Sequence, residues 1–353
     1  MGKTMTVALD GESLTIDRLV DVARNKQHVR VTDEAWKRIE SSRRMLEKKI
    51  DAHETMYGVT TGIGEFSEVT LTPQQIKEFQ KLLIYSHAAG IGEPMEREVV
   101  RGAMCGRINV HSKGYSGGRR KVTEYLVESL NHELTPVVCE KGSVGACGDL
   151  APMSQIALAL MGEGEMFVNG EIMDSKTALN DIGLKPLELE ARDGLAIING
   201  SNVLTALAAI ILHDAKRWMK LHDITASMTL EALMANMKPY DKRIHVLRGF
   251  QGSQKVSANL NLITTDSEIL FSGKKKVQDA YSMRSTPQVA GTLRDAIEFA
   301  TKQVETELNG VGDNPIFLTK EKEVLTGANF QGTPVALPME MIGTGLSMVA
   351  VIS

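Results

Sequence analysis

Apolar positions recur every three or four residues along most of the chain, and this spacing predicts a mainly α-helical fold. Near the N-terminus, TVALDGESLTIDRLVDVARN instead predicts a short strand, a tight turn at Asp10-Gly11 and then a helix. Further helices are expected over residues 33–52, 74–89 and 96–111. Another is expected over MSQIALALMGEGE, where a glycine-rich break ends the apolar pattern.

The longest uninterrupted helical pattern covers residues 204–237, which contain neither glycine nor proline. A single helix of that length would extend about 50 Å. Because its first half is strongly apolar, we expect it to be buried in a helical bundle or a subunit interface. A second apolar pattern, PVALPMEMIGTGLSMVAVIS, predicts a core helix over residues 334–353. We expect another segment or a second polypeptide to cover that helix.

Two short segments break the helical pattern and predict β-hairpins. MFVNGEIMD, residues 166–174, has Asn169-Gly170 at its centre, the dipeptide that favours a two-residue hairpin turn. FLTKEKEVL, residues 317–325, has the same character. The chain shows no internal repeat and no low-complexity linker.

Composition and charge favour some partners over others. The chain is 42% hydrophobic and 24% charged, with a net charge of −4, so it has no general attraction for nucleic acid or for an anionic membrane. The three cysteines, Cys105, Cys139 and Cys147, form no CxxC pair, which argues against a disulfide framework or a zinc site and favours the cytoplasm. We expect no signal peptide and, for want of eighteen successive apolar residues, no membrane span.

The segment GSVGACGDLAP, residues 142–152, combines three glycines with an alanine around Cys147. Taken alone, it is typical of a turn that leads into a helix near Asp149, and it fits neither GxGxxG nor a Walker A loop. It also permits backbone chemistry. If the Gly148 nitrogen attacks the Ala146 carbonyl carbon, small neighbours leave the path clear for a five-membered ring. Loss of water and of the β-substituent then leaves an exocyclic methylene, a strong electrophile, with Asp149 placed to assist proton removal.

GSVGACGDLAP resembles the GSVGASGDLAP motif of the histidine ammonia-lyase family. These aromatic amino-acid lyases and aminomutases build a 4-methylidene-imidazol-5-one (MIO) group from Ala-Ser-Gly. The resemblance covers essentially the whole chain and predicts a long-helix bundle of the aromatic ammonia-lyase type. It implies an N-terminal domain over residues 1–200, with the MIO-type loop and active-site loops, and the start of a central bundle over residues 201–353. The other motifs are MYGVTTGIGEF (56–66), SHAAGIGEP (86–94), RINVHSKGYSG (107–117), GLAIINGS (194–201), VQDAYSMRSTPQVAG (277–291), ELNGVGDNP (307–315) and GANFQGTPVA (327–336).

The resemblance implies a catalytic role for several matched residues. The MIO group would form from Ala146, Cys147 and Gly148. Tyr57 would be the catalytic base near the β-carbon of the substrate, on a loop that closes over it, and Asn199 would hydrogen-bond the MIO carbonyl. Taken alone, Tyr57 is better explained as a half-buried structural tyrosine.

The resemblance also assigns substrate-binding residues. His87 would read the substrate ring, and a histidine there suits an imidazole or a phenol better than a bare phenyl ring. The Arg284 guanidinium would bind the substrate carboxylate, with Asn314 close by. Taken alone, His87 is a typical core histidine, and Asn314 a turn residue before proline. Three further residues are matched. Gln278 and Tyr281 would be polar supports of the site, with Tyr281 among the catalytic residues. The Phe330 ring would pack beside the MIO group.

The implied activity is the non-oxidative elimination of ammonia from an L-aromatic amino acid, with histidine favoured and urocanate as its product. A 2,3-aminomutase, or a catalytically silent subunit that retains an unmodified Cys147, is the alternative. Neither a metal nor a nucleotide is expected. The family is usually a homotetramer, so we expect an oligomer. For the C-terminal part of the family's length that this sequence lacks, the alternatives are a separate chain, removal by cleavage and loss, and we favour a separate chain that supplies it.

Overall fold

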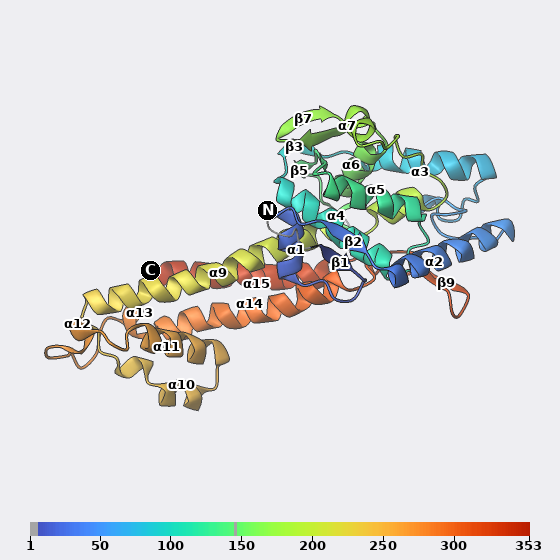
Figure 1. The fold of residues 1–353 in the computed structure, drawn as a ribbon. Helices are drawn as coiled ribbons and strands as arrows, with labels where there is room; N and C mark the ends of the chain where they lie inside the picture. The colour runs from blue at the N-terminus through green and yellow to red at the C-terminus, as the bar shows by residue number, and fades with distance from the viewer. Residues whose placement is uncertain (1–5, 145–146) are drawn as a thin grey trace. The chain divides into compact units, whose positions relative to one another are not determined.

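The computed structural model describes residues 6–144 and 147–353 and confirms a mainly helical fold with small strands (Figure 1). The chain divides into two compact units. Unit 1 comprises Met1–Ile210 and Val304–Pro334, and unit 2 comprises Ile211–Gln303 and Val335–Ser353. The domain boundary expected after residue 200 stays a prediction.

The elements of unit 1 run from β1 to α8 and resume with β8 and β9. In chain order they are β1 (Val7–Leu9), α1 (Ile16–Ala23), β2 (Val29–Val31), α2 (Asp33–Asp51), η1 (Gly64–Phe66), α3 (Pro73–His87), β3 (Ile91–Pro94), α4 (Arg97–Ser112), α5 (Arg120–Asn131), β4 (Thr135–Pro136), β5 (Cys139–Lys141), α6 (Leu150–Leu160), β6 (Glu165–Val168), β7 (Glu171–Asp174), α7 (Ser175–Asp181), α8 (Asp193–Ile198), β8 (Ile316–Leu318) and β9 (Glu323–Leu325).

Unit 2 is helical throughout its described elements. Those that lie within it alone are η2 (Lys238–Tyr240), α10 (Lys242–Arg248), α11 (Gln251–Ile263), α12 (Glu268–Phe271) and α13 (Tyr281–Arg284). Three helices contribute residues to both units: α9 (Asn202–Ala232), α14 (Thr286–Leu308) and α15 (Thr333–Ile352).

Local sequence explains why the predicted helices of unit 1 begin where they do. The Thr32 side chain accepts a hydrogen bond from the backbone N–H of Ala35 and so caps α2. At the start of α3, Thr72 and Gln75 form a reciprocal capping box, and Pro73 occupies the first turn, where its missing N–H costs nothing. These signals depend on nearby residues alone, which is why they could be recognised in the sequence.

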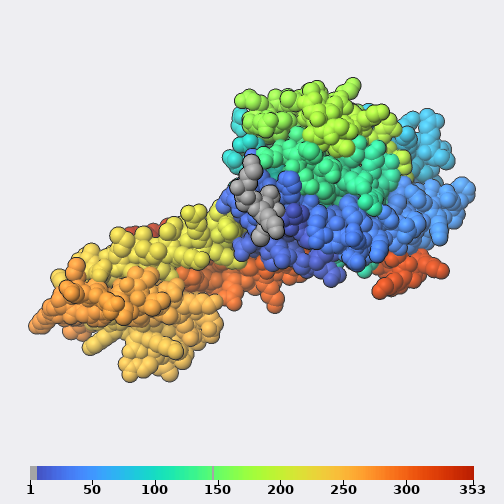
Figure 2. Space-filling model, viewed as in Figure 1, coloured from blue at the N-terminus to red at the C-terminus, as the bar shows by residue number. Residues whose placement is uncertain are grey.

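The sheets of unit 1 are small. β1 pairs with β2 in parallel, β3 pairs with β5, and β4, β6 and β7 form an antiparallel sheet of three strands. Both predicted hairpins are confirmed, as β6–β7 and β8–β9. The first turns through Asn169 (φ 50°) and Gly170 (φ 96°), the positive angles that a tight hairpin requires. Figure 2 shows this hairpin and α7, in yellow-green, at the surface of unit 1.

The predicted helix over residues 204–237 is confirmed for most of its length, but its C-terminal end is wrong. α9 ends at Ala232, and Met234 then takes a positive φ of 49°. The cause is a contact distant in the sequence. The backbone N–H of Asn236 donates to the Asp279 carboxylate (2.6 Å), and the Asn236 side chain donates to the Lys276 carbonyl (2.9 Å). These bonds replace the ones that a continued helix would have made.

Two helical stretches among the described residues are long and apolar enough to cross a membrane, Asp193–Ala232 and Thr333–Ile352. The expectation of no membrane span counted only unbroken apolar runs; length and composition alone do not contradict it, and it stays a prediction. Mean hydropathy tolerates scattered polar residues. The most apolar part of the first stretch is 83% buried within the protein, as in a core helix, whereas that of the second is 28% buried.

A buried cluster joins three segments of unit 1 behind the loop that carries Tyr57. Leu46 comes from α2, Met56 and Val59 from the loop, and Phe317 from β8. Phe317 is fully buried, and its ring leaves no space for a side chain at Gly117, where a Cβ would lie 2.8 Å from it. The cluster therefore anchors the base of the loop to the body of the unit.

We predict that Phe317→Ala lowers the free energy of unfolding by about 3–5 kcal/mol, because it leaves a cavity that the packed cluster cannot fill. Urea unfolding followed by circular dichroism measures the change. Phe66→Ala is the matched control, since Phe66 is 68% exposed in the same unit and its loss should change stability by about 0.5 kcal/mol or less. Equal losses in the two variants would contradict the assignment of this cluster to the core.

Candidate active site

The turn proposed to form the MIO group ends at the N-terminus of α6. Ala146 lies outside the described residues. Cys147 is 5% exposed, and Gly148 has a φ of +62°, a left-handed conformation that only glycine adopts without strain. The carbonyl oxygen of Cys147 accepts a hydrogen bond from the Asp149 backbone N–H (2.6 Å). The backbone is therefore tightly turned around Gly148, whose nitrogen ring closure would use.

The Asp149 carboxylate fastens this turn to the first turn of α9. One oxygen accepts from the Ser143 hydroxyl (2.9 Å), and the other accepts from the backbone N–H of Leu204 (2.9 Å). The carboxylate therefore bonds one of the free N–H groups at the helix N-terminus, where negative charge is favourable. Burial raises the pKa of Asp149 above its ordinary value, although the hydrogen bonds oppose that shift.

The Cys147 thiol faces the segment that follows α8. The backbone N–H of Gly200 lies close enough to the thiol to lower its pKa, which places Cys147 beside the Asn199–Gly200 peptide. Burial raises the pKa of Cys147 to about 11, and the Gly200 contact offsets the shift only in part. An unmodified thiol is thus protonated at neutral pH and is a poor nucleophile in that form.

Asn199 and Asn314 meet in the interior of unit 1, although 115 residues separate them. Asn199 ends α8, and its side-chain amide donates to the carbonyl oxygen of Asn314 (2.7 Å). The Asn314 side chain accepts from the backbone N–H of Gly327 (2.8 Å), at the start of the GANFQG motif. The structure thus brings three of the predicted motifs together at one place.

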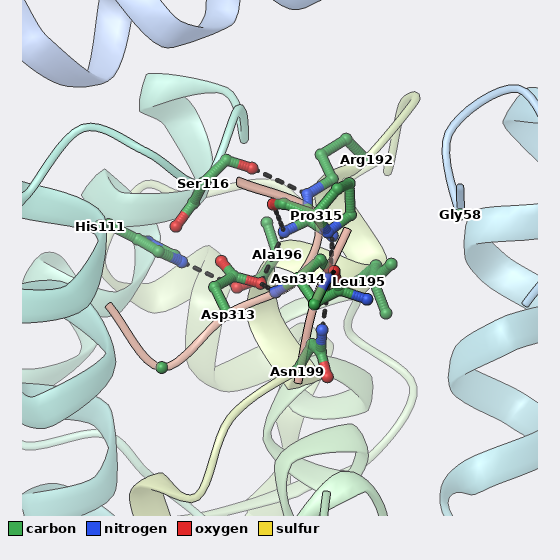
Figure 3. Close-up of polar contacts among 12 residues, drawn as sticks. Gly58, His111, Ser116, Arg192, Leu195, Ala196, Asn199, Asp313, Asn314 and Pro315 are labelled. Atoms are coloured by element: carbon green, nitrogen blue, oxygen red, sulfur yellow. Dashed lines mark hydrogen bonds and ion pairs between the residues drawn. The ribbon is translucent and has the colours of Figure 1, made fainter. Parts of the chain in front are cut away.

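A buried ion network lies beside these two asparagines (Figure 3). The Asp313 carboxylate accepts from the guanidinium of Arg107 (2.8 Å) on one oxygen and from that of Arg192 (2.6 Å) on the other. All three side chains are fully buried. Arg107 also donates to the carbonyl oxygens of Asn199 (2.9 Å) and Ala196 (2.6 Å). Sequence reasoning assigned no role to any member of this network.

Tyr57 lies on the loop between α2 and α3 and is half-buried. Its hydroxyl accepts from the backbone N–H of Gly64 (3.3 Å). The next residue, Gly58, has a φ of +63°, and a Cβ there would lie 2.4 Å from the side chain of Leu195 on α8. The buried Gln80 side chain donates to the Gly58 carbonyl (3.4 Å) and accepts from the Leu195 N–H (3.3 Å). The loop is therefore held against the helix that ends at Asn199.

His87 is the last residue of α3 and is half-buried. Its Nδ1 lies 2.9 Å from the Leu83 carbonyl oxygen and 2.9 Å from the Ser86 hydroxyl. Because a carbonyl can only accept, Nδ1 carries the hydrogen. In a neutral His87 the other ring nitrogen, Nε2, is then an acceptor.

Phe330 is half-buried and lies on the loop before α15. Its carbonyl oxygen accepts from the hydroxyl of Ser201, two residues after Asn199 (2.7 Å). A Cβ at Gly332 would lie 2.9 Å from Leu204 and 3.0 Å from that hydroxyl, so the loop passes close to the start of α9. The position of Phe330 thus agrees with the predicted neighbourhood, while its contact with an MIO group stays a prediction.

The other predicted site residues, Gln278, Tyr281 and Arg284, belong to unit 2. Gln278 is exposed and precedes α13, which Tyr281 begins and Arg284 ends. Tyr281 is 68% exposed, and the Arg284 guanidinium lies 4.9 Å from the centre of its ring. Arg284 is half-buried, and a partly accessible guanidinium stacked on a ring is chemically suited to an anionic ligand. The roles of these three residues stay predictions.

Sequence reasoning missed Gln80, Arg107, Arg192 and Asp313. Arg107 and Asp313 lie within two of the matched motifs. A charged residue inside a motif to which no role is assigned is the one sequence signal that could have identified them. Gln80 and Arg192 lie outside the motifs, and their partners are distant in sequence, so nothing local marks them. Among the described residues, no group of three or more His, Cys, Asp or Glu side chains is placed to hold a metal ion.

Comparison with known proteins gives concordant results. A model of the family described as aromatic amino acid lyase matches residues 14–353. A histidine ammonia-lyase of Alkaliphilus metalliredigens is 40% identical over 98% of this chain and 69% of its own length. The crystal structure of histidine ammonia-lyase from Trypanosoma cruzi matches with a TM-score of 0.89 and 33% identity, over 99% of this chain and 65% of that one. The crystal structure of tyrosine aminomutase from Streptomyces globisporus matches with a TM-score of 0.90 and 30% identity, over 99% of this chain and 69% of that one. The predicted type of helical fold is confirmed.

We predict that Gly58→Ala destabilises the Tyr57 loop more than Gly64→Ala does. Both positions have positive φ, so each alanine costs about 1–2 kcal/mol in backbone strain. Only Gly58 adds a clash, because Leu195 is buried whereas nothing lies within 4 Å of a Cβ at Gly64. Overpacking adds about 1–3 kcal/mol. Limited proteolysis of the loop, with urea unfolding of the whole protein, measures the difference. Equal cleavage rates in the two variants would show that the contact with α8 does not hold the loop.

Proposed function

The chain belongs to the aromatic amino acid lyase family, and from this premise we propose that it is a histidine ammonia-lyase, which eliminates ammonia from L-histidine to give urocanate. The observation that carries the proposal is the meeting of Cys147 with the Asn199–Gly200 peptide inside unit 1. It joins the turn suited to ring closure with the asparagine assigned to the MIO carbonyl. The similarity to proteins named histidine ammonia-lyase supports the choice of substrate.

The described residues of the turn fit an MIO group. Gly148 has no Cβ to block its nitrogen, and its left-handed φ already bends the backbone back on itself. Among the described residues, a Cβ there would have only the Ser143 hydroxyl within 4 Å, at 3.6 Å, which leaves space beside the Gly148 nitrogen. Ring closure joins the Gly148 nitrogen to the Ala146 carbonyl carbon and releases one water. Loss of hydrogen sulfide from Cys147 then leaves the methylene, which supplies an electrophilic carbon that activates the bound amino acid.

The chain's own side chains would hold and deprotonate the substrate around that carbon. Asn199 has a two-hydrogen amide, and only one of these hydrogens is needed for its bond to Asn314, so the other can be donated to the MIO carbonyl. Tyr57 would take the β-proton at its phenol oxygen. The Gly64 N–H donates to that oxygen and so helps to orient the phenol.

The substrate preference follows from His87. Its Nδ1–H is committed to the Leu83 carbonyl, so neutral His87 offers Nε2 as an acceptor. The imidazole of histidine carries an N–H that can donate to it. A phenyl ring has no such donor and would leave the nitrogen without a partner, which is the basis of strong discrimination. We propose that Arg284 and Asn314 each serve the substrate carboxylate, and that Gln278, Tyr281 and Phe330 each have the supporting role that their motifs imply.

A 2,3-aminomutase is the second candidate, supported by the tyrosine aminomutase similarity at 30% identity. It would return the amine to the β-carbon, so formation of a β-amino acid distinguishes it from the lyase. A catalytically silent subunit that retains the Cys147 thiol is the third candidate, and it would release neither product.

We further propose that the protein acts in the cytoplasm as a homotetramer. Support comes from α15, which has a row of exposed apolar side chains in unit 2 that water disfavours. These are Leu337, Met341, Met348 and Val351.

We predict that the intact chain is lighter than its sequence by one water and one hydrogen sulfide, as measured by mass spectrometry. Cys147→Ser should lose two waters instead and retain activity, because its hydroxyl is also a β-leaving group. Cys147→Ala has no leaving group, so it should lose only water, if it cyclises, and turnover should fall by at least about 10²-fold, the loss typical of removing a transition-state stabiliser. Cys139→Ala is the control and should keep the wild-type mass deficit and turnover. An unmodified mass would overturn the MIO assignment.

We also predict that Tyr57→Phe lowers kcat for L-histidine by about 10²–10⁴-fold with little change in KM, because it removes the base but not the ring contacts. Absorbance of the unsaturated product measures the rate. Tyr125→Phe is the matched control, since its hydroxyl donates to the Lys185 carbonyl (2.8 Å) in the same unit. A kcat of Tyr57→Phe close to that of Tyr125→Phe would remove Tyr57 from the mechanism.

A further inference from the structure

The Asp313 carboxylate is a buried anion between two buried cations. It accepts from Arg107 and Arg192 on separate oxygens, and the oxygen that accepts from Arg192 also accepts from the backbone N–H of Asn314 (2.7 Å). The neighbouring His111 adds no charge to the network. Burial lowers its pKa to about 3, and its Nε2–H donates to the Ala196 carbonyl (2.8 Å). Asp313 is therefore the single negative charge that separates two guanidinium groups in this network.

Both guanidinium groups also hold the backbone of the two asparagines that meet in the site. Arg107 donates to the carbonyl oxygen of Asn199 (2.9 Å), and Arg192 donates to that of Asn314 (2.9 Å). The Asn314 carbonyl oxygen is also the one that accepts from the Asn199 side chain. One atom thus joins the arginine network to the amide proposed to act on the MIO carbonyl (Figure 3).

We propose that Asp313 is a positioning residue for Asn199. Through Arg107 and Arg192, Asp313 holds the Asn199 carboxamide in the orientation from which the amide donates to the MIO carbonyl. The inference deepens the proposed function and rests on it. Asp313 touches neither the substrate nor the proposed MIO atoms, so its effect reaches the reaction only through Asn199 and Asn314.

The charge arrangement explains why a neutral side chain cannot replace Asp313. Without the carboxylate, two guanidinium groups in a medium of low polarity repel each other and lose a shared acceptor. Each would move toward other acceptors and draw its bonded carbonyl with it. The Arg192 backbone is itself constrained by a φ of +76°, so its side chain has little freedom to compensate.

Asp313→Asn tests the inference because it preserves shape and removes the charge. We expect kcat to fall by about 10- to 10²-fold, less than the ~10²–10³-fold loss typical when such a donor is removed outright. We expect no further loss when the substitution is combined with Asn199→Ala, because both variants remove the same interaction. Additive losses, or an unchanged kcat in Asp313→Asn, would overturn the proposal.

Asp193→Asn is the matched control. Asp193 is also fully buried and also accepts from an arginine, Arg119 (2.6 Å), but it bonds neither asparagine of the site. A purely structural role for buried aspartates predicts equal effects on kcat in the two variants. Positioning predicts that both variants lose stability, whereas Asp313→Asn alone loses kcat.

Arg192→Lys keeps the test decisive if Asp313→Asn does not fold. It retains the positive charge but cannot bond Asp313 and the Asn314 carbonyl through a planar fork. We expect a loss of kcat that again is not additive with Asn199→Ala. An additive loss counts against the proposal.

A crystal structure of Asp313→Asn, or of Arg192→Lys in its place, gives a readout that needs no turnover. We expect the 2.7 Å contact between the Asn199 amide and the Asn314 carbonyl to lengthen or break. Retention of that contact would overturn the inference. If the unsubstituted protein fails to convert L-histidine, the proposed function fails, whereas the geometry of Asn199 in the variant still decides the positioning role.

Discussion

The ion network of Arg107, Asp313 and Arg192 is the constraint on which the candidate site depends, because it joins chain segments that nothing local connects. Arg107 and Asp313 are 206 residues apart, yet they share one buried contact. Burying an ion costs several kcal/mol unless other groups satisfy it, and here backbone carbonyls from α8 and from the Gly312–Pro315 turn complete the guanidinium bonds. The same carbonyls belong to the segments that carry Asn199 and Asn314. The hydrogen bonds that satisfy the two buried guanidinium groups therefore also fix the positions of Asn199 and Asn314.

How much of the fold the sequence predicts depends on how local each signal is. α2, α3 and the β6–β7 hairpin were predictable because capping residues and the Asn169-Gly170 turn act within a few positions. The end of α9 was not, because Asn236 bonds to Asp279, a partner that no periodicity reveals. The candidate site divides in the same way. Motifs identified Tyr57 and Asn199, but the groups that support them, Gln80 and Asp313, owe their roles to contacts more than 20 residues distant.

Glycine has two distinct uses in the site, and they place different demands on the backbone. At Gly58 a left-handed φ and the proximity of Leu195 both exclude a side chain, so the loop bearing Tyr57 can approach α8 closely. At Gly148 the φ is again left-handed, but space remains around the missing Cβ. Close packing explains the first glycine, whereas it does not explain the second. The free space at Gly148 agrees with a backbone nitrogen that must itself react.

The cysteine in the turn changes the leaving group rather than the geometry of ring closure. Elimination breaks the C–S bond of Cys147 and releases hydrosulfide, whereas a serine would release hydroxide. Hydrosulfide is the weaker base and therefore leaves more readily. Burial raises the pKa of the Cys147 thiol to about 11. The same burial keeps the unmodified thiol protonated, so it cannot substitute for the electrophile as a nucleophile at neutral pH. On chemical grounds, therefore, sulfur at this position favours elimination to the methylene over an independent role for the thiol.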